Sequence, residues 1–75
     1  MITLEYAINL AERTTGKIDS ISDCGDRWVF DFFDEKYKFG TVSMFVFKKN
    51  GKFEYFSRLM EEYQEILKNS KPISL

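Results

Sequence analysis

Hydrophobic positions are concentrated in the range Arg27–Phe56, which holds most of the aromatic residues and which we take as the centre of the fold. Bulky aromatic residues occupy every second position of Arg27–Phe33, and Thr41–Lys48 is a second run of β-branched and aromatic residues. Asn50-Gly51 separates this second run from Phe53–Phe56. Asn-Gly is a strong hairpin signal, because both residues accept positive φ. The pattern therefore predicts an antiparallel sheet.

A helix is predicted before the sheet, over Thr3–Thr15, where apolar side chains recur at the spacing of one helical face. Thr3 is a suitable N-cap, since its hydroxyl can accept from a free backbone N–H. Gly16 follows the last turn, where a left-handed closing residue is favoured. The apolar positions are Leu4, Ala7, Ile8 and Ala11.

A second helix is predicted after the sheet, over Ser57–Lys68, with Ser57 as its N-cap. Its apolar face consists of Leu59, Tyr63, Ile66 and Leu67. Pro72 cannot continue the helix. Two possibilities remain open for Ile73–Leu75, a frayed tail or a short added strand.

A further strand is expected at Lys17–Ser22, where Ile18 and Ile21 lie three residues apart, so the strand is short or contains a bulge. Asp23–Asp26 is rich in the Asp and Gly that tight turns require, and joins this strand to the next one as a hairpin.

The strand Arg27–Phe33 has two different faces. Trp28, Phe30 and Phe32 share one face and are expected to form the core. Asp31 lies on the other face, and burying an unpaired carboxylate is costly. We therefore expect the face that carries Asp31 to be the more solvent-exposed one.

The hairpin register is open to two interpretations. A two-residue turn at Asn50-Gly51 pairs Val46 with Tyr55 and Lys48 with Phe53, and we favour it. A turn of three residues with a bulge would instead bring the phenyl rings of both strands to one face. A slip of one residue exchanges the faces of a strand, so the choice matters for the core.

Together these elements predict one α+β domain over residues 1–75. We expect an N-terminal helix, an antiparallel meander of three to four strands and a C-terminal helix. Both helices are expected to pack on one sheet face. A chain of 75 residues builds only a small core, and dimerisation is one way to enlarge it.

Net charge and hydrophobic runs limit the possible partners. The net charge is −1, whereas a dedicated nucleic-acid binder usually has a strong basic excess, so nucleic acid is an unlikely partner. No apolar run approaches the length of a membrane span, and no membrane association is expected. Met1–Glu5 lacks the features of a signal peptide and Cys24 is the single cysteine. We expect a cytoplasmic protein that begins at its native terminus.

Catalytic chemistry finds little support. The chain has no His and one Cys, which removes Ser–His and Cys–His pairs and imidazole metal sites. No glycine-rich phosphate loop occurs. The acidic neighbours Asp23 and Asp26 disfavour a thiolate at Cys24. We expect no enzyme activity, no cofactor, no metal site and no catalytic residue.

Charged residues suggest two possible interaction surfaces. An acidic edge would contain Asp31, Asp34 and Glu35, with Asp23 and Asp26. A basic edge would contain Lys48, Lys49 and Lys52, with Lys17, Lys36 and Lys38, and exposed aromatic rings beside it would resemble a platform for single-stranded nucleic acid. Lysines at a hairpin tip or an edge strand also serve to prevent aggregation. A small-molecule or metal pocket between helix and sheet is the third hypothesis.

The aromatic residues on both faces of the sheet favour a role in protein binding. If two helices cover one face, then Phe33, Phe45, Phe47 and Phe56 are candidates for exposure on the other, and an exposed apolar patch marks an interface. We expect Asp31, Phe33, Phe45 and Phe47 to contact a protein partner. That partner can be a second copy of the chain, because the same patch then meets itself.

The chain also resembles a known group of proteins. Trp28-Val29-Phe30, then Gly40, then Lys48-Lys49-Asn50-Gly51 form a W-x-F strand, a Gly-led strand and a K-x-x-G hairpin. This pattern resembles toxin-immunity proteins of the polymorphic-toxin type and related small bacterial proteins. The resemblance covers about half the chain, and implies a cytosolic, non-enzymatic α+β protein that acts by binding a partner.

Overall fold

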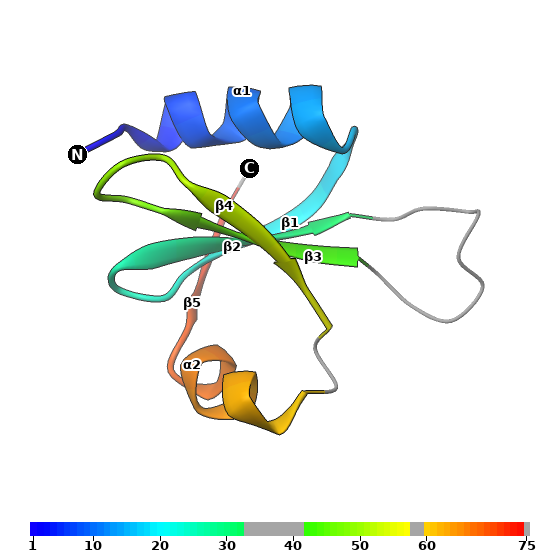
Figure 1. Cartoon of the computed structure of the whole chain (residues 1–75), viewed down its shortest axis with the longest axis vertical. Helices are drawn as coiled ribbons and strands as arrows, with labels where there is room; N and C mark the ends of the chain where they lie inside the picture. Colours follow the sequence, from blue (N-terminus) through cyan, green and yellow to red (C-terminus); the bar gives the residue numbers. More distant parts are fainter. Residues whose placement is uncertain (33–41, 58–59, 75) are drawn as a thin grey trace.

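A computed structural model describes residues 1–32, 42–57 and 60–74 of the chain. Two helices lie above and below a central sheet (Figure 1). In chain order the elements are α1 (Leu4–Thr14), β1 (Ile18–Asp23), β2 (Arg27–Phe32), β3 (Val42–Phe47), β4 (Phe53–Phe56), the 3-10 turn η1 (Glu61–Tyr63), α2 (Gln64–Lys68) and β5 (Lys71–Ile73).

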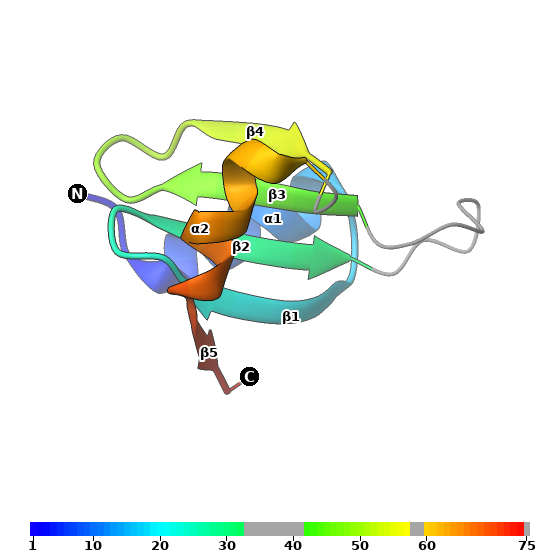
Figure 2. The ribbon, with the colours of Figure 1, turned by 90° about the horizontal axis from the view of Figure 1, so that it is seen from below.

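The described residues form one antiparallel sheet of five strands in the order β4-β3-β2-β1-β5. The first four strands follow one another as a meander, as predicted, although the connection between β2 and β3 lies outside the described residues. The fifth is the C-terminal segment, in which Ile73 pairs with Ile21 of β1. An added strand is present, but it spans Lys71–Ile73, so Ile73 is the one residue it shares with the predicted segment Ile73–Leu75, and Leu75 lies outside the described residues. The strand β4 lies at the opposite margin of the sheet (Figure 2).

The helix α1 covers one face of the sheet, as its apolar stripe predicts. Thr3 is its N-cap, with its Oγ1 accepting from the Tyr6 N–H at 3.1 Å. Ala7 and Ala11 are fully buried, and their small size lets the helix approach the sheet closely. The residues buried with them are Ile18, Ile21, Trp28, Phe30, Phe32, Met44 and Val46. Trp28, Phe30 and Phe32 thus form the core face that the alternation predicts.

The prediction that both helices pack on one face is wrong, because α2 lies on the opposite face (Figure 1). The residues of this second cluster are Val29, Phe45 and Phe56, with Cys24, Phe47, Tyr63, Ile66 and Leu67 packed against them. The physical reason is that β2 and β3 are apolar on both faces. A helix on each side removes both faces from water, which one layer of helices does not do.

The face of β2 that carries Asp31 is consequently buried, and the expectation that this face is the more solvent-exposed one is wrong. Asp31 is 7% exposed. Its two carboxylate oxygens accept hydrogen bonds from Ser20 Oγ at 2.8 Å and from Ser43 Oγ at 2.6 Å. Neighbouring strands supply these hydroxyls, so the cost of burying a carboxylate is offset by partners that the sequence pattern did not reveal.

The first strand contains the expected irregularity. Its register with β2 shifts between Ile18 and Ser20, which indicates a β-bulge. One extra residue reverses the alternation, so Ile18 and Ile21 both lie in the core beneath α1 despite being three residues apart. The turn that follows is closed by a hydrogen bond from the Cys24 N–H to the Arg27 carbonyl at 2.8 Å, as expected of a hairpin.

The hairpin between β3 and β4 has neither of the two predicted registers. Val46 pairs with Phe53, not with Tyr55. The Gly51 N–H donates to the Phe47 carbonyl at 2.9 Å and Gly51 has φ +75°, so the loop is longer than a two-residue turn. The shift from the favoured register is two residues, which keeps each side chain on the face expected for it.

The second helix begins later than predicted. The Ser57 carbonyl accepts from the Met60 N–H in a turn at 3.2 Å. In the described residues η1 follows Met60, and regular helix begins at Gln64 with Tyr63 at the N-cap position. The chain leaves β4 at the margin of the sheet and must reach the middle of the α2 face. There Tyr63 contacts the rings of Phe45 and Phe56. Within the described residues, the 3-10 turn Glu61–Tyr63 stands where the pattern predicts α-helix.

Candidate functional site

The outer margin of β4 is the most distinctive surface of the described residues, because its backbone is open to solvent. The Phe47 N–H donates to the Lys52 carbonyl at 2.8 Å, so these two residues form a hydrogen-bonded pair. Antiparallel pairs alternate between hydrogen-bonded and non-bonded. The backbone of Glu54 therefore faces β3, and the N–H and C=O of Phe53 and Tyr55 face outward. Within the described residues no hydrogen bond reaches these outward groups.

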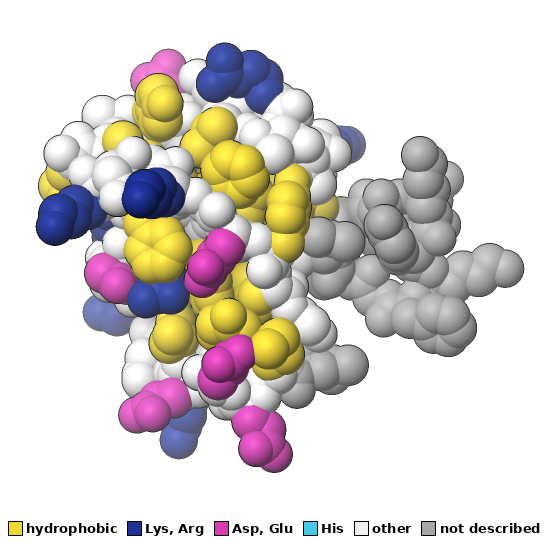
Figure 3. All heavy atoms as spheres, in the orientation of Figure 1, with side chains coloured by type: hydrophobic (Ala, Val, Ile, Leu, Met, Phe, Trp, Pro, Cys, Tyr) yellow, Lys and Arg dark blue, Asp and Glu magenta, His cyan; other side chains and the backbone are white. Residues whose placement is uncertain are grey.

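Aromatic side chains flank this open backbone on the α1 side. Phe53 is 42% exposed and Tyr55 is 49% exposed, and their rings meet edge to face with centroids 6.0 Å apart. The Tyr55 hydroxyl is 2.8 Å from Thr15 Oγ1, which connects β4 to the end of α1. Figure 3 shows the face of the molecule that carries β4. Hydrophobic side chains extend over this face from α1 across β4 to α2, with charged groups among them.

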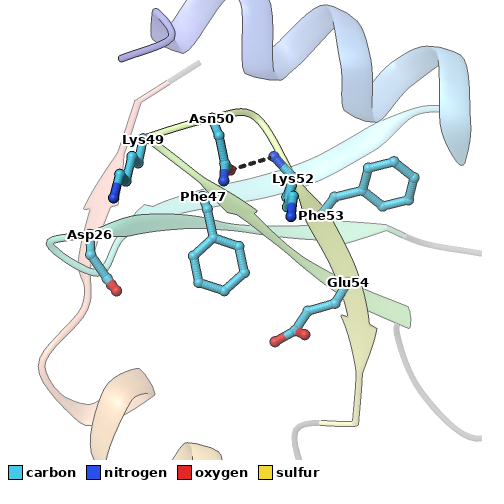
Figure 4. Close-up of a pocket in the computed structure, with 7 residues that line it drawn as sticks. All are labelled: Asp26, Phe47, Lys49, Asn50, Lys52, Phe53 and Glu54. Atoms are coloured by element: carbon cyan, nitrogen blue, oxygen red, sulfur yellow. Dashed lines mark hydrogen bonds between the residues drawn. The ribbon is translucent and has the colours of Figure 1, made fainter.

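Charged side chains flank the same backbone on the α2 side. Glu54 of β4 and Lys52, the residue before β4, are both exposed and alternate with Phe53 and Tyr55. Both line a hollow of about 420 Å³, together with Asp26, Phe47, Lys49, Asn50 and Phe53. Figure 4 shows the side chains of Asp26, Phe47 and Glu54 directed to one side of the sheet, with Phe53 directed away.

Arg27 contacts two of the residues that line this hollow, Asp26 and Phe47. Its guanidinium lies 4.9 Å from the centroid of the Phe45 ring and 4.5 Å from that of Phe47. Asp26 binds the guanidinium through both oxygens, at 2.9 and 3.0 Å. This hydrogen bonding lowers the pKa of Asp26 and raises the pKa of Arg27. Asp26 is therefore paired, whereas Glu54, whose charge also raises the pKa of Arg27, forms no salt bridge among the described residues.

A second ion pair holds the hairpin of β3 and β4 against the turn of β1 and β2. Lys48 Nζ lies 2.9 Å from Asp23 Oδ1 and 5.1 Å from the centroid of the Trp28 ring. The Gly25 N–H also donates to Asp23 at 2.8 Å. The hydrogen bond from Gly25, followed by that from Lys48, lowers the pKa of the Asp23 carboxyl.

Of the residues expected to contact a partner, the three that the structure describes do not form one exposed surface. Phe45 is fully buried under α2, stacked on Phe56 with ring centroids 3.9 Å apart, so its expected exposure is wrong. Asp31 is buried as described above, and Phe47 is half-buried beside Arg27. Phe33 lies outside the described residues. The exposure expected of Phe56 is also wrong, because it is 8% exposed.

The two predicted charged edges are only partly present in the described residues. Asp23, Asp26 and Lys48 are engaged in the ion pairs above. Lys17, Lys49 and Lys52 are exposed. The remaining members lie outside the described residues: Asp34, Glu35, Lys36 and Lys38.

No three His, Cys, Asp or Glu side chains of the described ranges gather closely enough to hold a metal ion. Cys24 is half-buried and packs against the α2 cluster. Among the residues that can be described, neither helix has the length and apolar character needed to cross a lipid bilayer.

The sequence interpretation missed Phe53, Glu54 and Tyr55 as candidate contacts. The available signal was their place in the last strand of the meander, which predicts an edge position, combined with two aromatic residues that alternate with charges. The other edge of the sheet differs, because β5 is short and contains Lys71 and Pro72, both of which discourage pairing.

Comparison with known protein families, with curated proteins and with solved structures found no match to this chain.

Proposed function

We propose that this protein is a non-enzymatic interaction module that binds an extended segment of another protein along β4. The observation that carries this proposal is the pair of outward backbone positions at Phe53 and Tyr55, each with a free N–H and C=O in the described residues. An extended peptide that adds to an open sheet edge gains backbone hydrogen bonds, and specificity comes from pockets for alternate side chains.

The side chains around this edge support the same proposal. Phe53 and Tyr55 are large aromatic residues that are more than two-fifths exposed. Aromatic residues are enriched at protein interfaces, where their burial supplies much of the binding energy. The aromatic rings and the open backbone belong to the same two residues, so one bound strand would cover both.

The lone cysteine favours a cytoplasmic location for this module. The sequence resemblance favours a toxin-immunity role for it. Protein binding by such a module needs no reactive side chain. Its selectivity would come from the shape and charge of the β4 margin.

Binding of single-stranded nucleic acid is the alternative, and one observation favours it. Lys49 and Lys52 are exposed and line the same hollow as Phe53, and basic residues beside aromatic rings bind single strands by stacking. Such binding would weaken steeply as salt rises. Fluorescence anisotropy with mixed-sequence oligonucleotides at low salt tests it, and an unchanged signal would exclude this function.

The edge-binding function is tested with peptides selected by the wild-type protein from a random library. We expect the selected peptides to bind Tyr55→Pro at least roughly tenfold more weakly, because proline removes an outward N–H and blocks the new ladder. Proline is tolerated at edge positions whose N–H faces solvent, so this variant keeps its fold.

Tyr55→Thr is the matched control, since it removes the same ring but keeps the N–H and a strand-forming side chain. It should retain more binding than Tyr55→Pro. Selected peptides that bind Tyr55→Pro as tightly as wild type would show that the edge is not the site.

A further inference from the structure

We propose that the segment bound along β4 is antiparallel and alternates apolar and charged residues in the order apolar, basic, apolar, acidic. This inference rests on the proposed function and specifies the chemistry of its partner. In that arrangement the basic residue lies opposite Glu54 and the acidic residue lies opposite Lys52. The two apolar residues lie opposite Tyr55 and Phe53.

The alternation follows from the two sides of β4. Successive side chains of a strand point to opposite faces, and directly opposite residues of a paired strand share a face. Phe53 and Tyr55 point to the α1 side, where they are exposed aromatic rings. Lys52 and Glu54 point to the α2 side, as does Phe56, which is buried in the α2 cluster. A bound strand therefore meets rings on one face and charges on the other.

The order of the charges follows from the antiparallel direction. In an antiparallel pair the partner advances toward its C-terminus as β4 recedes from Tyr55 to Lys52. The residue opposite Glu54 therefore precedes the residue opposite Lys52 by two positions. Opposite charges placed directly across a ladder stabilise it, and like charges destabilise it.

The hollow on the α2 side provides space for the basic side chain. Phe47 and Glu54 both line it, and Figure 4 shows them directed to the same side of the sheet. A basic side chain opposite Glu54 would contact the Phe47 ring with its apolar stem and Glu54 with its charge. The Phe47 ring already accepts one cation, the Arg27 guanidinium, at 4.5 Å.

A second copy of this chain satisfies these requirements only in part. When β4 pairs with itself around Glu54, the backbone bonds form at Phe53 and Tyr55, but the two Glu54 carboxylates lie opposite each other. When it pairs around Phe53, Lys52 meets Glu54 of the other copy, but Tyr55 then lies opposite Gly51, which belongs to the hairpin loop. A segment of another protein can satisfy both the backbone and the charges, so it fits the edge better.

The test compares two synthetic peptides of identical composition, Thr-Val-Lys-Val-Glu-Thr and Thr-Val-Glu-Val-Lys-Thr, by NMR titration of the full chain. We expect wild type to bind the first peptide roughly tenfold more tightly, because the second places like charges opposite each other. The variant Lys52→Glu/Glu54→Lys should reverse this preference. Bound peptide should also slow the exchange of the Phe53 and Tyr55 amide protons, and Tyr55→Pro should bind neither peptide.

The outcomes separate this inference from the proposed function. Protection of Phe53 and Tyr55 with equal affinity for both peptides would overturn the charge order and leave edge binding intact. Binding without that protection would overturn both, since the peptide would then lie elsewhere. A stable dimer in light scattering, dissociated by Tyr55→Pro, would overturn the choice of partner and identify a second copy as the occupant.

Discussion

Asp23 shows how a single carboxylate connects two hairpins. It accepts from the Gly25 N–H within its own turn and binds Lys48 from the turn after β3. Each of these bonds favours the charged form, so the pKa of Asp23 lies below its ordinary value of 3.8. Lys48 in turn lies over the Trp28 ring, which covers the end of the core beneath α1.

This arrangement predicts how stability depends on pH. Because the pKa of Asp23 is lowered in the folded state, the unfolded state binds more protons below about pH 4. The contribution of Asp23 is complete above that pH and is lost as pH falls through the folded pKa. Urea unfolding at several pH values measures this effect. Asp23→Asn should reduce the loss in the free energy of unfolding between neutral and acidic pH. Asp19→Asn, which changes an exposed carboxylate of the same strand, should leave that loss as large as in wild type.

At the scale of elements, α2 is a short helix held in place by aromatic packing. Five residues are too few for a helix to be stable alone. The Tyr63 ring contacts Phe45 at 5.2 Å and Phe56 at 5.1 Å between centroids. The burial of this ring raises the pKa of Tyr63, and the carboxylates of Glu62 and Glu54 raise it further. The helix therefore depends on the face of the sheet beneath it.

Replacing Phe45 should loosen α2 specifically. Phe45→Leu keeps an apolar side chain but removes two ring contacts, which contribute about 0.5–1.5 kcal/mol each. We expect a loss of about 1–3 kcal/mol in the free energy of unfolding, with faster hydrogen exchange along α2. Phe32→Leu is the control, since Phe32 is equally buried but belongs to the α1 cluster. If Phe32→Leu accelerates exchange in α2 as much as Phe45→Leu does, the ring packing is not what holds this helix.

At the scale of the whole molecule, the sheet has one blocked edge and one open edge. The short β5 ends the sheet beside β1 with Lys71 and Pro72. The β4 edge carries outward backbone groups and exposed aromatic rings, a combination that favours self-association. A charged residue on such an edge opposes pairing with another copy, and Glu54 is placed to do this.

Glu54 should therefore keep the protein monomeric. Glu54→Gln removes the like-charge contact in the symmetric register around this residue, so we expect self-association at protein concentrations where wild type remains a monomer. Light scattering over a range of concentrations measures this difference. Glu61→Gln makes the same change in net charge on exposed residues away from the edge, and it should behave as wild type. If Glu54→Gln and wild type self-associate to the same extent, then Glu54 does not prevent pairing at the β4 edge.

Local chemistry made several parts of this fold predictable. Each of these parts depends on residues that lie close together in the sequence. They are the Thr at the N-cap, the turn of Asp and Gly residues, and the alternation of Trp28, Phe30 and Phe32. The bulge in β1 was predictable for the same reason, because Ile18 and Ile21 lie three residues apart. The candidate site was much less predictable, since Phe45 and Phe47 were favoured as exposed residues and Phe53 and Tyr55 were overlooked.

The class of the fold, the first helix, the four strands of the meander and the turn between β1 and β2 follow from the amino-acid sequence. These features depend on side-chain periodicity and on backbone preferences, which are properties of neighbouring residues. The face that each helix covers, the burial of Asp31 against two serines, the register of the β3–β4 hairpin and the open edge at β4 emerge only from tertiary packing. Those outcomes depend on which segments, far apart in the chain, bury one another. The periodicity of one segment contains no information about its contacts with distant segments.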